Sequence, residues 1–199
     1  MTENDYQTDR IDIYFSENAG VDFIPAHYHR DYQILFVVRG TIEITIEERT
    51  YTAPAGSVIF ITNLERHRLR ILESPYHCYV ISIPQNHLFM MPEECPLLSV
   101  FLQRPGHFYH VLSLDGNQSE QVRRHAQRML DEKTEQKPFW ETDMSCLLTE
   151  FLICLYRFDP DYFPGSGSAS AANIVFSVQK YISRNYKSSI SLTDAAAVN

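Results

Sequence analysis

Residues 11 to about 85 contain short runs of β-branched and aromatic residues, several with a period of two. The clearest run is TIEITIEE at residues 41–48, where Ile42, Ile44 and Ile46 share one face and polar residues occupy the other. The predicted strands are residues 11–15, 32–38, 41–48, 57–62, 68–72 and 76–83, and the predicted turn residues are Gly40, Pro54, Gly56 and Pro75. Many short strands at close spacing predict an antiparallel sandwich or barrel.

After about residue 115 the apolar period changes to that of a helix. Asn117, with Glu120 three residues later, resembles an N-cap and its partner carboxylate. The first helix carries Val122, Ala126, Met129 and Leu130, and the second, after a break at Lys137 and Pro138, carries Trp140, Met144, Leu147, Leu148, Phe151, Leu152 and Leu155. The short break predicts an antiparallel hairpin, so the expected fold class is mainly β with C-terminal helices.

The apolar face of the second helix is wide enough for two uses. Packing against the barrel alone explains most of it. The width leaves some surface over, which predicts a subunit contact in a homodimer. The residues expected at this dimer interface are Trp140, Met144, Leu148, Phe151, Leu152 and Leu155.

The predicted organisation is a barrel at residues 1–115, a helix hairpin at 116–162, a linker at 163–172 and a further helical segment at 173–199. The linker, FPGSGSASAA, is small and uncharged. Beyond it Ile174, Val175, Val178, Tyr181 and Ile182 recur at helical spacing. Ser191 and Asp194 resemble a capping box that opens another helix, and barely two turns follow. The expectation is a domain that has been started and not finished.

Charge is distributed unevenly along the chain, which has a formal net charge of −8. Residues 171–199 carry +2, which leaves −10 for residues 1–170. DNA binding draws much of its affinity from Lys and Arg on phosphates, so only the tail is suited to DNA. The start of the chain does not resemble a signal peptide, no apolar run approaches membrane-spanning length, and the four cysteines form no CxxC pair. These features predict a cytoplasmic protein without a membrane partner.

Three histidines and a glutamine form the candidate site. His27 and His29 lie two residues apart, so they share one face of a strand, and Gln33 follows four residues later. His67 comes from another strand. Imidazoles placed in this way are able to bind a divalent metal, since three ligands suffice for zinc. They are equally able to line a ligand pocket and form hydrogen bonds with water or an effector.

These residues resemble the two cupin motifs. The first motif is G-x5-H-x-H-x3,4-E-x6-G, and this chain has Gly20, then six residues, His27, His29, three residues, Gln33, six residues and Gly40. The second, G-x5-P-x-G-x2-H-x3-N, corresponds to Gly56 and His67, with Thr62, Leu64 and Ile71 at its other conserved positions. The resemblance covers roughly residues 10–85. It implies a small jelly-roll barrel whose interior holds these side chains.

The resemblance also implies a tentative metal site at His27, His29, His67 and Gln33, with zinc or nickel as the expected ion. Cupin metal sites usually combine three His with one Glu. Gln33 replaces that carboxylate, so the site has one negative charge fewer. The small-molecule site expected from the resemblance consists of His27, His29, Gln33, His67 and Tyr32.

The tail, together with the barrel and hairpin before it, resembles an AraC/XylS-type transcription regulator. The matching residues are Tyr181-Ile182, Asn185-Tyr186 and SLTDAA at residues 191–196. The resemblance implies an effector-sensing and dimerising unit ahead of a helix-turn-helix DNA-binding domain, in which Ser191, Thr193 and Lys187 belong to the DNA-binding part. A generic C-terminal helical hairpin is the other interpretation of the tail. DNA is the expected partner of the complete protein and not of these 199 residues.

The sequence indicates no enzyme, because it contains no evident nucleophile, general-base pair or phosphate loop. The alternative is a metal-dependent cupin enzyme, a dioxygenase or isomerase, with His27, His29 and His67 as metal ligands. Gln33 and the tail argue against that alternative.

Overall fold

The computed structural model describes residues 9–18, 22–88, 95–102, 104, 108–164 and 171–197. Its strands are β1 Asp12–Asn18, β2 Phe23–His27, β3 Tyr32–Ile46, β4 Arg49–Pro54, β5 Ser57–Ile61, β6 His67–Ile83 and β7 Val111–Ser113. Its helices are α1 Gln85–Leu88, α2 Ser99–Leu102, α3 Gly116–Glu135, α4 Trp140–Phe158, α5 Ala171–Asn185 and α6 Leu192–Ala196, with 3-10 turns at Pro96–Leu98 and Pro160–Tyr162. Gly20 and most of the predicted linker lie outside the described residues.

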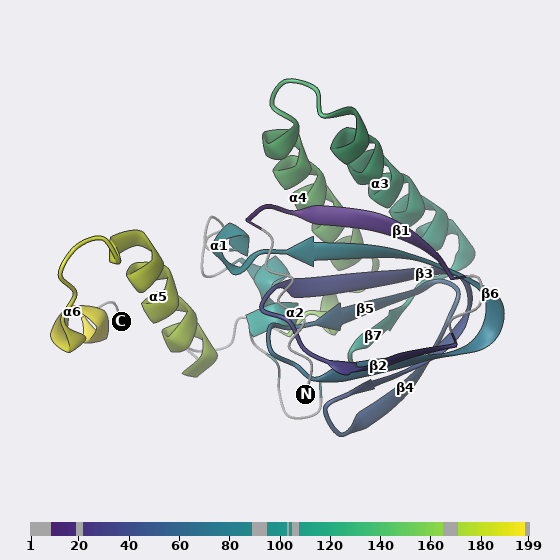
Figure 1. The fold of residues 1–199 in the computed structure, drawn as a ribbon, viewed down its shortest axis with the longest axis horizontal. Helices are drawn as coiled ribbons and strands as arrows, with labels where there is room; N and C mark the ends of the chain where they lie inside the picture. Colours follow the sequence, from purple (N-terminus) through teal and green to yellow (C-terminus); the bar gives the residue numbers. More distant parts are fainter. Residues whose placement is uncertain are drawn as a thin grey trace.

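Two long strands, β3 and β6, pair with each other along their lengths and take part in both layers of an antiparallel β structure. The first half of β3 and the second half of β6 are flanked by β5 and β1, and β7 extends this layer beyond β5. The other halves of β3 and β6 are flanked by β4 and β2. Figure 1 shows the two layers closing around an interior. The predicted fold class, a cupin-type jelly-roll barrel followed by helices, is confirmed.

Gly40 and Pro75 lie inside these long strands, so the prediction that they are turn residues between separate strands is wrong. The pairing of β3 with β6 shifts in register between Val37 and Thr41, where Gly40 has φ +81°. A Cβ at Gly40 would lie 2.5 Å from the carbonyl oxygen of Glu73. The strands therefore bend there without ending, and this bend carries each strand from one layer to the other. Gly56, by contrast, lies in a true turn between β4 and β5.

The first layer is buried on both of its faces. Alternate residues of β3, namely Ile34 and Phe36, pack toward the helices, whereas Leu35 and Val37 belong to the barrel interior. β5 and β6 divide their side chains in the same way. This explains the uninterrupted apolar runs at residues 34–38, 58–61 and 78–81, while the 41–46 half of β3, with an outer face in solvent, alternates.

Helices α3 and α4 run antiparallel, side by side, along the barrel near β1 (Figure 1). The N-cap of α3 is Asp115, whose side chain accepts a hydrogen bond from the Gln118 backbone, and the Gln118 side chain returns one to Asp115. The capping box therefore begins two residues earlier than the predicted Asn117. Carboxylate and amide satisfy the same free N–H groups at either position, so sequence spacing alone does not separate the two.

The apolar face of α4 packs against the barrel of its own chain. Five of the six residues predicted at a dimer interface are at most 1% exposed, and Trp140 is half-buried. They join the side chains of β3, β5 and β6 in one core; the five are Met144, Leu148, Phe151, Leu152 and Leu155. This corrects the residue assignment, because side chains buried in one copy are not available to a second copy.

Helices α5 and α6 follow the barrel and hairpin as a small separate unit in Figure 1. Gln85 in α1 donates a hydrogen bond to the side chain of Gln179 in α5 at 3.0 Å, and Ser177 is buried. The predicted Ser191–Asp194 capping box is present at the start of α6. None of the described helices has the length and apolar character needed to cross a membrane.

Candidate functional site

The structure brings His27, His29 and His67 together at one end of the barrel. Their ring centroids are 4.3 Å apart for His27 and His67, 5.0 Å for His29 and His67, and 6.2 Å for His27 and His29. His27 is opposite His67 where β2 pairs with β6. His67 has the same parity along β6 as Leu69, a residue of the barrel interior, so its ring lies on the interior side.

All three rings have the same hydrogen-bond pattern. Each Nδ1 lies 2.7–2.9 Å from a backbone carbonyl oxygen two residues away, at Pro25, Asp31 and Glu65 respectively. A carbonyl oxygen only accepts, so each Nδ1 carries the hydrogen and donates it. In the neutral ring the lone pair is then on Nε2. The backbone thereby fixes one tautomer in all three rings.

Gln33 and Tyr32 are adjacent in β3 and lie on opposite sides of the layer. Tyr32 is 2% exposed and packs edge-on against Phe101 at 5.3 Å, on the side that faces the helices. Gln33 has the parity of Leu35, an interior residue, and its side chain lies close enough to His29 to affect that ring's pKa. The expectation that Tyr32 contributes to the small-molecule site is therefore corrected, whereas Gln33 lies beside the histidines.

Burial disfavours the charged forms of His29 and His67. The pKa of His67 is lowered to about 4, mainly by burial and also by the nearby His27 and His29, against the opposing effect of the Glu65 carbonyl and carboxylate. Burial also lowers the pKa of His29, although Asp31 and Gln33 oppose this. The Nε2 atom of His29 is buried without a hydrogen-bond partner. A buried nitrogen lone pair without a donor is costly, so it calls for a ligand or water at this place.

His27, His29 and His67, with Gln33 beside them, are the candidate ligands for a metal. Among the residues that the structure describes, no group of three or more His, Cys, Asp or Glu side chains is found that could hold a metal ion. Gln33, a neutral amide, stands where a carboxylate would offset the charge of the ion. Each Nδ1 donates to a backbone carbonyl, so each Nε2 is oriented either to accept a hydrogen bond or to bind a metal. Metal occupancy stays a prediction.

We expect the free energy of unfolding to be highest above pH 6.5 and to fall as the pH drops from 6.5 toward 4. The unfolded chain protonates His67 at its ordinary pKa of 6.5, whereas the folded chain keeps it neutral until about 4, so acid favours unfolding. The gap between these values corresponds to about 3 kcal/mol. Urea unfolding measured at pH 7, 6, 5 and 4.5 tests this.

A matched pair of variants separates His67 from the other titrating groups. His67→Gln removes the ring, so the free energy of unfolding should depend less on pH between 6.5 and 4. The pH dependence that remains is expected to come from His29. His77→Gln, further along β6 and in edge contact with Phe15, should keep the wild-type profile. Equal pH dependence in wild type and His67→Gln would show that His67 is not the group responsible.

A second polar cluster, which the sequence analysis did not identify, adjoins the histidines. The Arg104 Nη1 atom contacts both carboxylate oxygens of Glu65, at 2.8 and 2.7 Å. His110 Nε2 lies 3.2 Å from Glu65, and the Tyr51 hydroxyl lies 2.8 Å from His110 Nδ1. Burial raises the pKa of Glu65, but the bond with His110 and the charge of Arg104 outweigh this, so its pKa lies below the ordinary value.

Glu65 connects the two clusters, because its backbone carbonyl accepts the Nδ1–H of His67 while its carboxylate holds Arg104. A cavity of about 420 Å³ opens beside this pair, lined by Ile46, Arg49, Glu65, Arg104, Phe108 and His110 among others. The sequence analysis did not single out His110. No spacing rule would have found it, since Glu65 precedes β6, Arg104 and His110 precede β7, and Tyr51 lies in β4.

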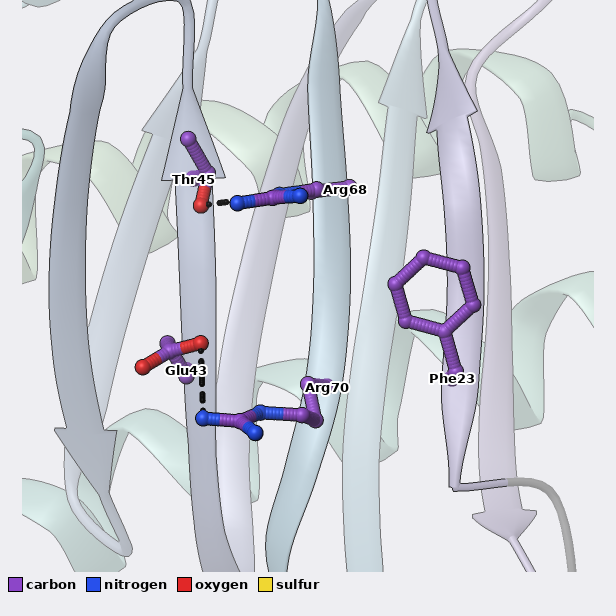
Figure 2. Close-up of a pocket in the computed structure, with 5 residues that line it drawn as sticks. All are labelled: Phe23, Glu43, Thr45, Arg68 and Arg70. Carbon is purple, nitrogen blue, oxygen red and sulfur yellow. Dashed lines mark hydrogen bonds and ion pairs between the residues drawn. The ribbon is translucent and has the colours of Figure 1, made fainter.

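A smaller hollow of about 210 Å³ lies on the outer face of the second layer, away from the helices (Figure 2). It contains the exposed ion pair of Arg70 with Glu43, at 3.1 Å, and Arg68, which donates to Thr45. Its arginines already have partners in the sheet, and nothing there is buried. We therefore place the candidate site at the barrel end and not on this face.

The residues expected in DNA contacts lie in and before α6. Ser191 caps α6 through Asp194, Thr193 is exposed in its first turn, and the Lys187 ammonium lies 5.7 Å from the ring of Tyr186. These placements are local to the tail, and a role in DNA binding stays a prediction.

A jelly-roll barrel with a polar cluster at one end and a helix hairpin on its side defines a ligand-binding cupin domain. The chain matches the AraC-like ligand binding domain over residues 11–152. It belongs to this family. No curated protein sequence has a significant similarity to the chain.

Among solved structures, apo ToxT from Vibrio cholerae matches at 11% identity and a TM-score of 0.50, covering 96% of this chain and 70% of that protein. An RmlC-like cupin from Methanocaldococcus jannaschii, with a double-stranded β-helix fold, matches at 18% identity and a TM-score of 0.36, covering 39% and 73%. Bacillus subtilis oxalate decarboxylase, a protein with Mn(II) centres, matches at 13% identity and a TM-score of 0.34, covering 43% and 27%. At these identities the likeness concerns the fold.

Proposed function

We propose that this chain is the effector-sensing part of a transcription regulator of the AraC/XylS type. The observation that carries the proposal is the cluster of three histidines, of which His29 and His67 are buried, inside a barrel of the AraC-like ligand binding family. A buried lone pair at His29 Nε2 needs a partner, and a small molecule entering the barrel supplies one. The proposed activity is binding and not catalysis.

The tautomer of the histidines defines what the site binds best. Neutral rings with Nδ1–H bound to the backbone offer Nε2 as an acceptor, so they favour ligand groups that donate, such as hydroxyl or amine. Because the pKa of His67 is about 4, this acceptor character holds at neutral pH. The Gln33 amide, with both donor and acceptor atoms, adds a group that suits a polyhydroxylated or amino compound.

A short path leads from the barrel end to the tail. Arg104 lies over the Phe108 ring at 4.7 Å, and Phe108 contacts Tyr162 at 5.6 Å, just before the segment that leads to α5. Ligand binding that moves this aromatic group would change how α5 is held. Such coupling requires that the ligand bind one arrangement more tightly than the other.

The regulator role implies two further partners. Full-length protein would bind DNA through a helix-turn-helix domain that begins with α5 and α6, in the cytoplasm and as a homodimer, because helix-turn-helix dimers match two-fold half-sites. With the apolar face of α4 buried, the subunit contact is expected on the outward faces of α3 and α4. Those faces carry charged residues such as Glu120, Arg124 and Arg128, so any dimer through them would be salt-sensitive.

The full-length protein should protect a site in the DNA upstream of its own operon, and a metabolite should alter that footprint. His67→Ala should abolish the metabolite's effect while DNA binding persists. Residues 1–199 alone should give no footprint, since they have a net charge of −8. A specific footprint from residues 1–199, or a metabolite response unaffected by His67→Ala, would contradict the proposal.

Elemental analysis of untagged protein distinguishes ligand binding by the rings from binding through a metal. Stoichiometric zinc or nickel that disappears in the His27→Ala, His67→Ala double variant would place a metal between effector and protein. It would also favour the alternative of a metal-dependent cupin enzyme. Metal-free protein that still responds to a metabolite supports direct binding by the imidazoles.

A further inference from the structure

Arg104 is a buried cation whose hydrogen-bonding capacity is only partly used. Its side chain is 11% exposed. Nη1 alone contacts Glu65, Nε donates to the backbone of Val100, and Nη2 is buried without a hydrogen-bond partner. A guanidinium normally binds a carboxylate through two parallel N–H groups, so Glu65 occupies this cation in an incomplete, single-nitrogen way.

Glu65 is in turn held by groups that would hold any carboxylate. The Thr62 backbone N–H donates to it at 2.8 Å, and His110 lies 3.2 Å away. Arg104, Thr62 and His110 thus form a site for an anion, which an internal carboxylate fills in this structure. Removing a carboxylate from a buried arginine is unfavourable unless another anion replaces it, so an exchange of carboxylates is the accessible reaction.

The cavity beside this site has room and lining for an organic ligand. Its volume of about 420 Å³ lies in the range of small-molecule pockets. Ile46 and the Phe108 ring supply apolar surface, whereas the exposed Glu47 and Glu48 outnumber the exposed Arg49 and leave the rim with a net negative charge. An acidic rim disfavours a dianion such as phosphate more than a monocarboxylate, because like charges repel.

We propose that this cavity binds a small organic monocarboxylate, which replaces Glu65 on Arg104. The freed Glu65 turns toward the solvent-filled part of the cavity, and Arg104 gains a carboxylate able to reach Nη2 as well. Since the Glu65 carbonyl holds His67, the exchange also perturbs the histidine cluster. The inference deepens the proposed function by naming a ligand class, and it rests on that function only for its regulatory consequence.

Phenylacetate and its neutral isostere phenylacetamide test the proposal on the unmodified chain by titration followed with NMR or calorimetry. Phenylacetate should bind, and phenylacetamide and inorganic phosphate should bind at least about tenfold more weakly, because the amide carries no charge and the dianionic form of phosphate is repelled by the acidic rim. Equal binding of acid and amide, preferential binding of phosphate, or no binding of phenylacetate would overturn the proposal. This comparison of ligands uses the wild-type protein alone.

Substitutions at Arg104 and at Glu65 are expected to change the affinity for phenylacetate in opposite directions. Arg104→Gln should weaken phenylacetate binding by at least about tenfold, because the cation is lost. Glu65→Gln should strengthen it by at least about threefold, since the competing carboxylate is removed while Arg104 stays charged. If Glu65→Gln does not fold, Glu65→Asp, which keeps the charge and retracts it from Nη1, should shift affinity in the same direction. Weaker binding in a folded Glu65 variant would overturn the exchange.

The exposed pair in Figure 2 supplies matched controls with the same changes in charge. Arg70→Gln and Glu43→Gln should leave phenylacetate binding within about twofold of wild type, because that pair lies on the outer face and is exposed to salt and water. If substitutions at the Arg70–Glu43 pair changed phenylacetate binding as much as those at the Arg104–Glu65 pair, binding would depend on net charge alone. That result would contradict the proposed site. Failure of phenylacetate to bind leaves the regulator proposal standing, because the footprint experiment tests it without this ligand.

Discussion

The double variant Leu148→Asp, Leu152→Asp is expected to unfold the protein and not to yield a folded monomer. Both side chains are at most 1% exposed in a single copy and lie in the core shared by α3, α4 and the barrel. Even Leu→Ala at one such position costs about 2–5 kcal/mol, and a buried unpaired carboxylate costs more. Two of them exceed the roughly 5–15 kcal/mol by which a domain of this size is stable.

Circular dichroism during thermal unfolding, together with sedimentation velocity, measures the effect. Cys146→Asp introduces the same charge at an exposed position of α4 and should stay within about 0.5 kcal/mol of wild type. A double variant that kept the wild-type melting temperature and sedimented as a smaller species would restore the dimer-interface assignment. The difference between the two helix faces is thus directly measurable.

The error behind that assignment has a physical cause. The spacing of apolar residues from Trp140 to Leu155 correctly predicted a helix and the width of its buried face. A hydrophobic stripe reports how much area leaves water and carries no information on which surface covers it. Here β3, β5 and β6 present a second apolar face outside the barrel, and the stripe lies in one core with that face and α3, apart from the half-buried Trp140. The strand sequences contained this information, since residues 34–38, 58–61 and 78–81 are uninterrupted apolar runs.

The barrel was predictable as a class, whereas its connectivity was not. Period-two runs located most strand segments, but they did not show that residues 32–38 and 41–48 belong to one strand. Gly40 has the same sequence signature in a turn and in a bend between layers. Which of the two it forms depends on the distant backbone at Glu73 and Pro75, which no local pattern contains. The short strands β2, β4 and β7 had too few alternating residues to be recognised.

The histidine cluster was predictable from the sequence, whereas the cluster around Glu65 was not. His27 and His29 share a strand face, so spacing brought them together, and the cupin resemblance added His67 from its partner strand. Glu65 lies between β5 and β6, Arg104 and His110 both lie between α2 and β7, and Tyr51 comes from β4, so no periodic pattern connects them. Their meeting is a consequence of how the chain packs at the barrel end, so only the structure reveals it.

Gly40→Ala is expected to destabilise the protein by about 3 kcal/mol or more. The residue has φ +81°, a region that costs an L-residue about 1–2 kcal/mol. Its new Cβ would also lie 2.5 Å from the Glu73 carbonyl oxygen and 2.9 Å from that of Pro75. Both contacts are with backbone atoms of β6, so relief requires the two long strands to separate at the bend, which adds a further overpacking cost of about 1–3 kcal/mol.

Gly116→Ala is the matched control, because the substitution is identical and its Cβ meets nothing within 4 Å. Gly116 is the first residue of α3, where alanine should stabilise the protein by up to about 1 kcal/mol. Urea unfolding of both variants measures the difference in their free energies of unfolding. A change at the bend is also expected to affect the position of the histidine cluster. Gly40 sits where β3 and β6 pass from one layer to the other, and the next stretch of β6 pairing ends at His67. A Gly40→Ala protein as stable as Gly116→Ala would mean that the bend is not held by this close backbone approach, and that the barrel positions His67 by other contacts.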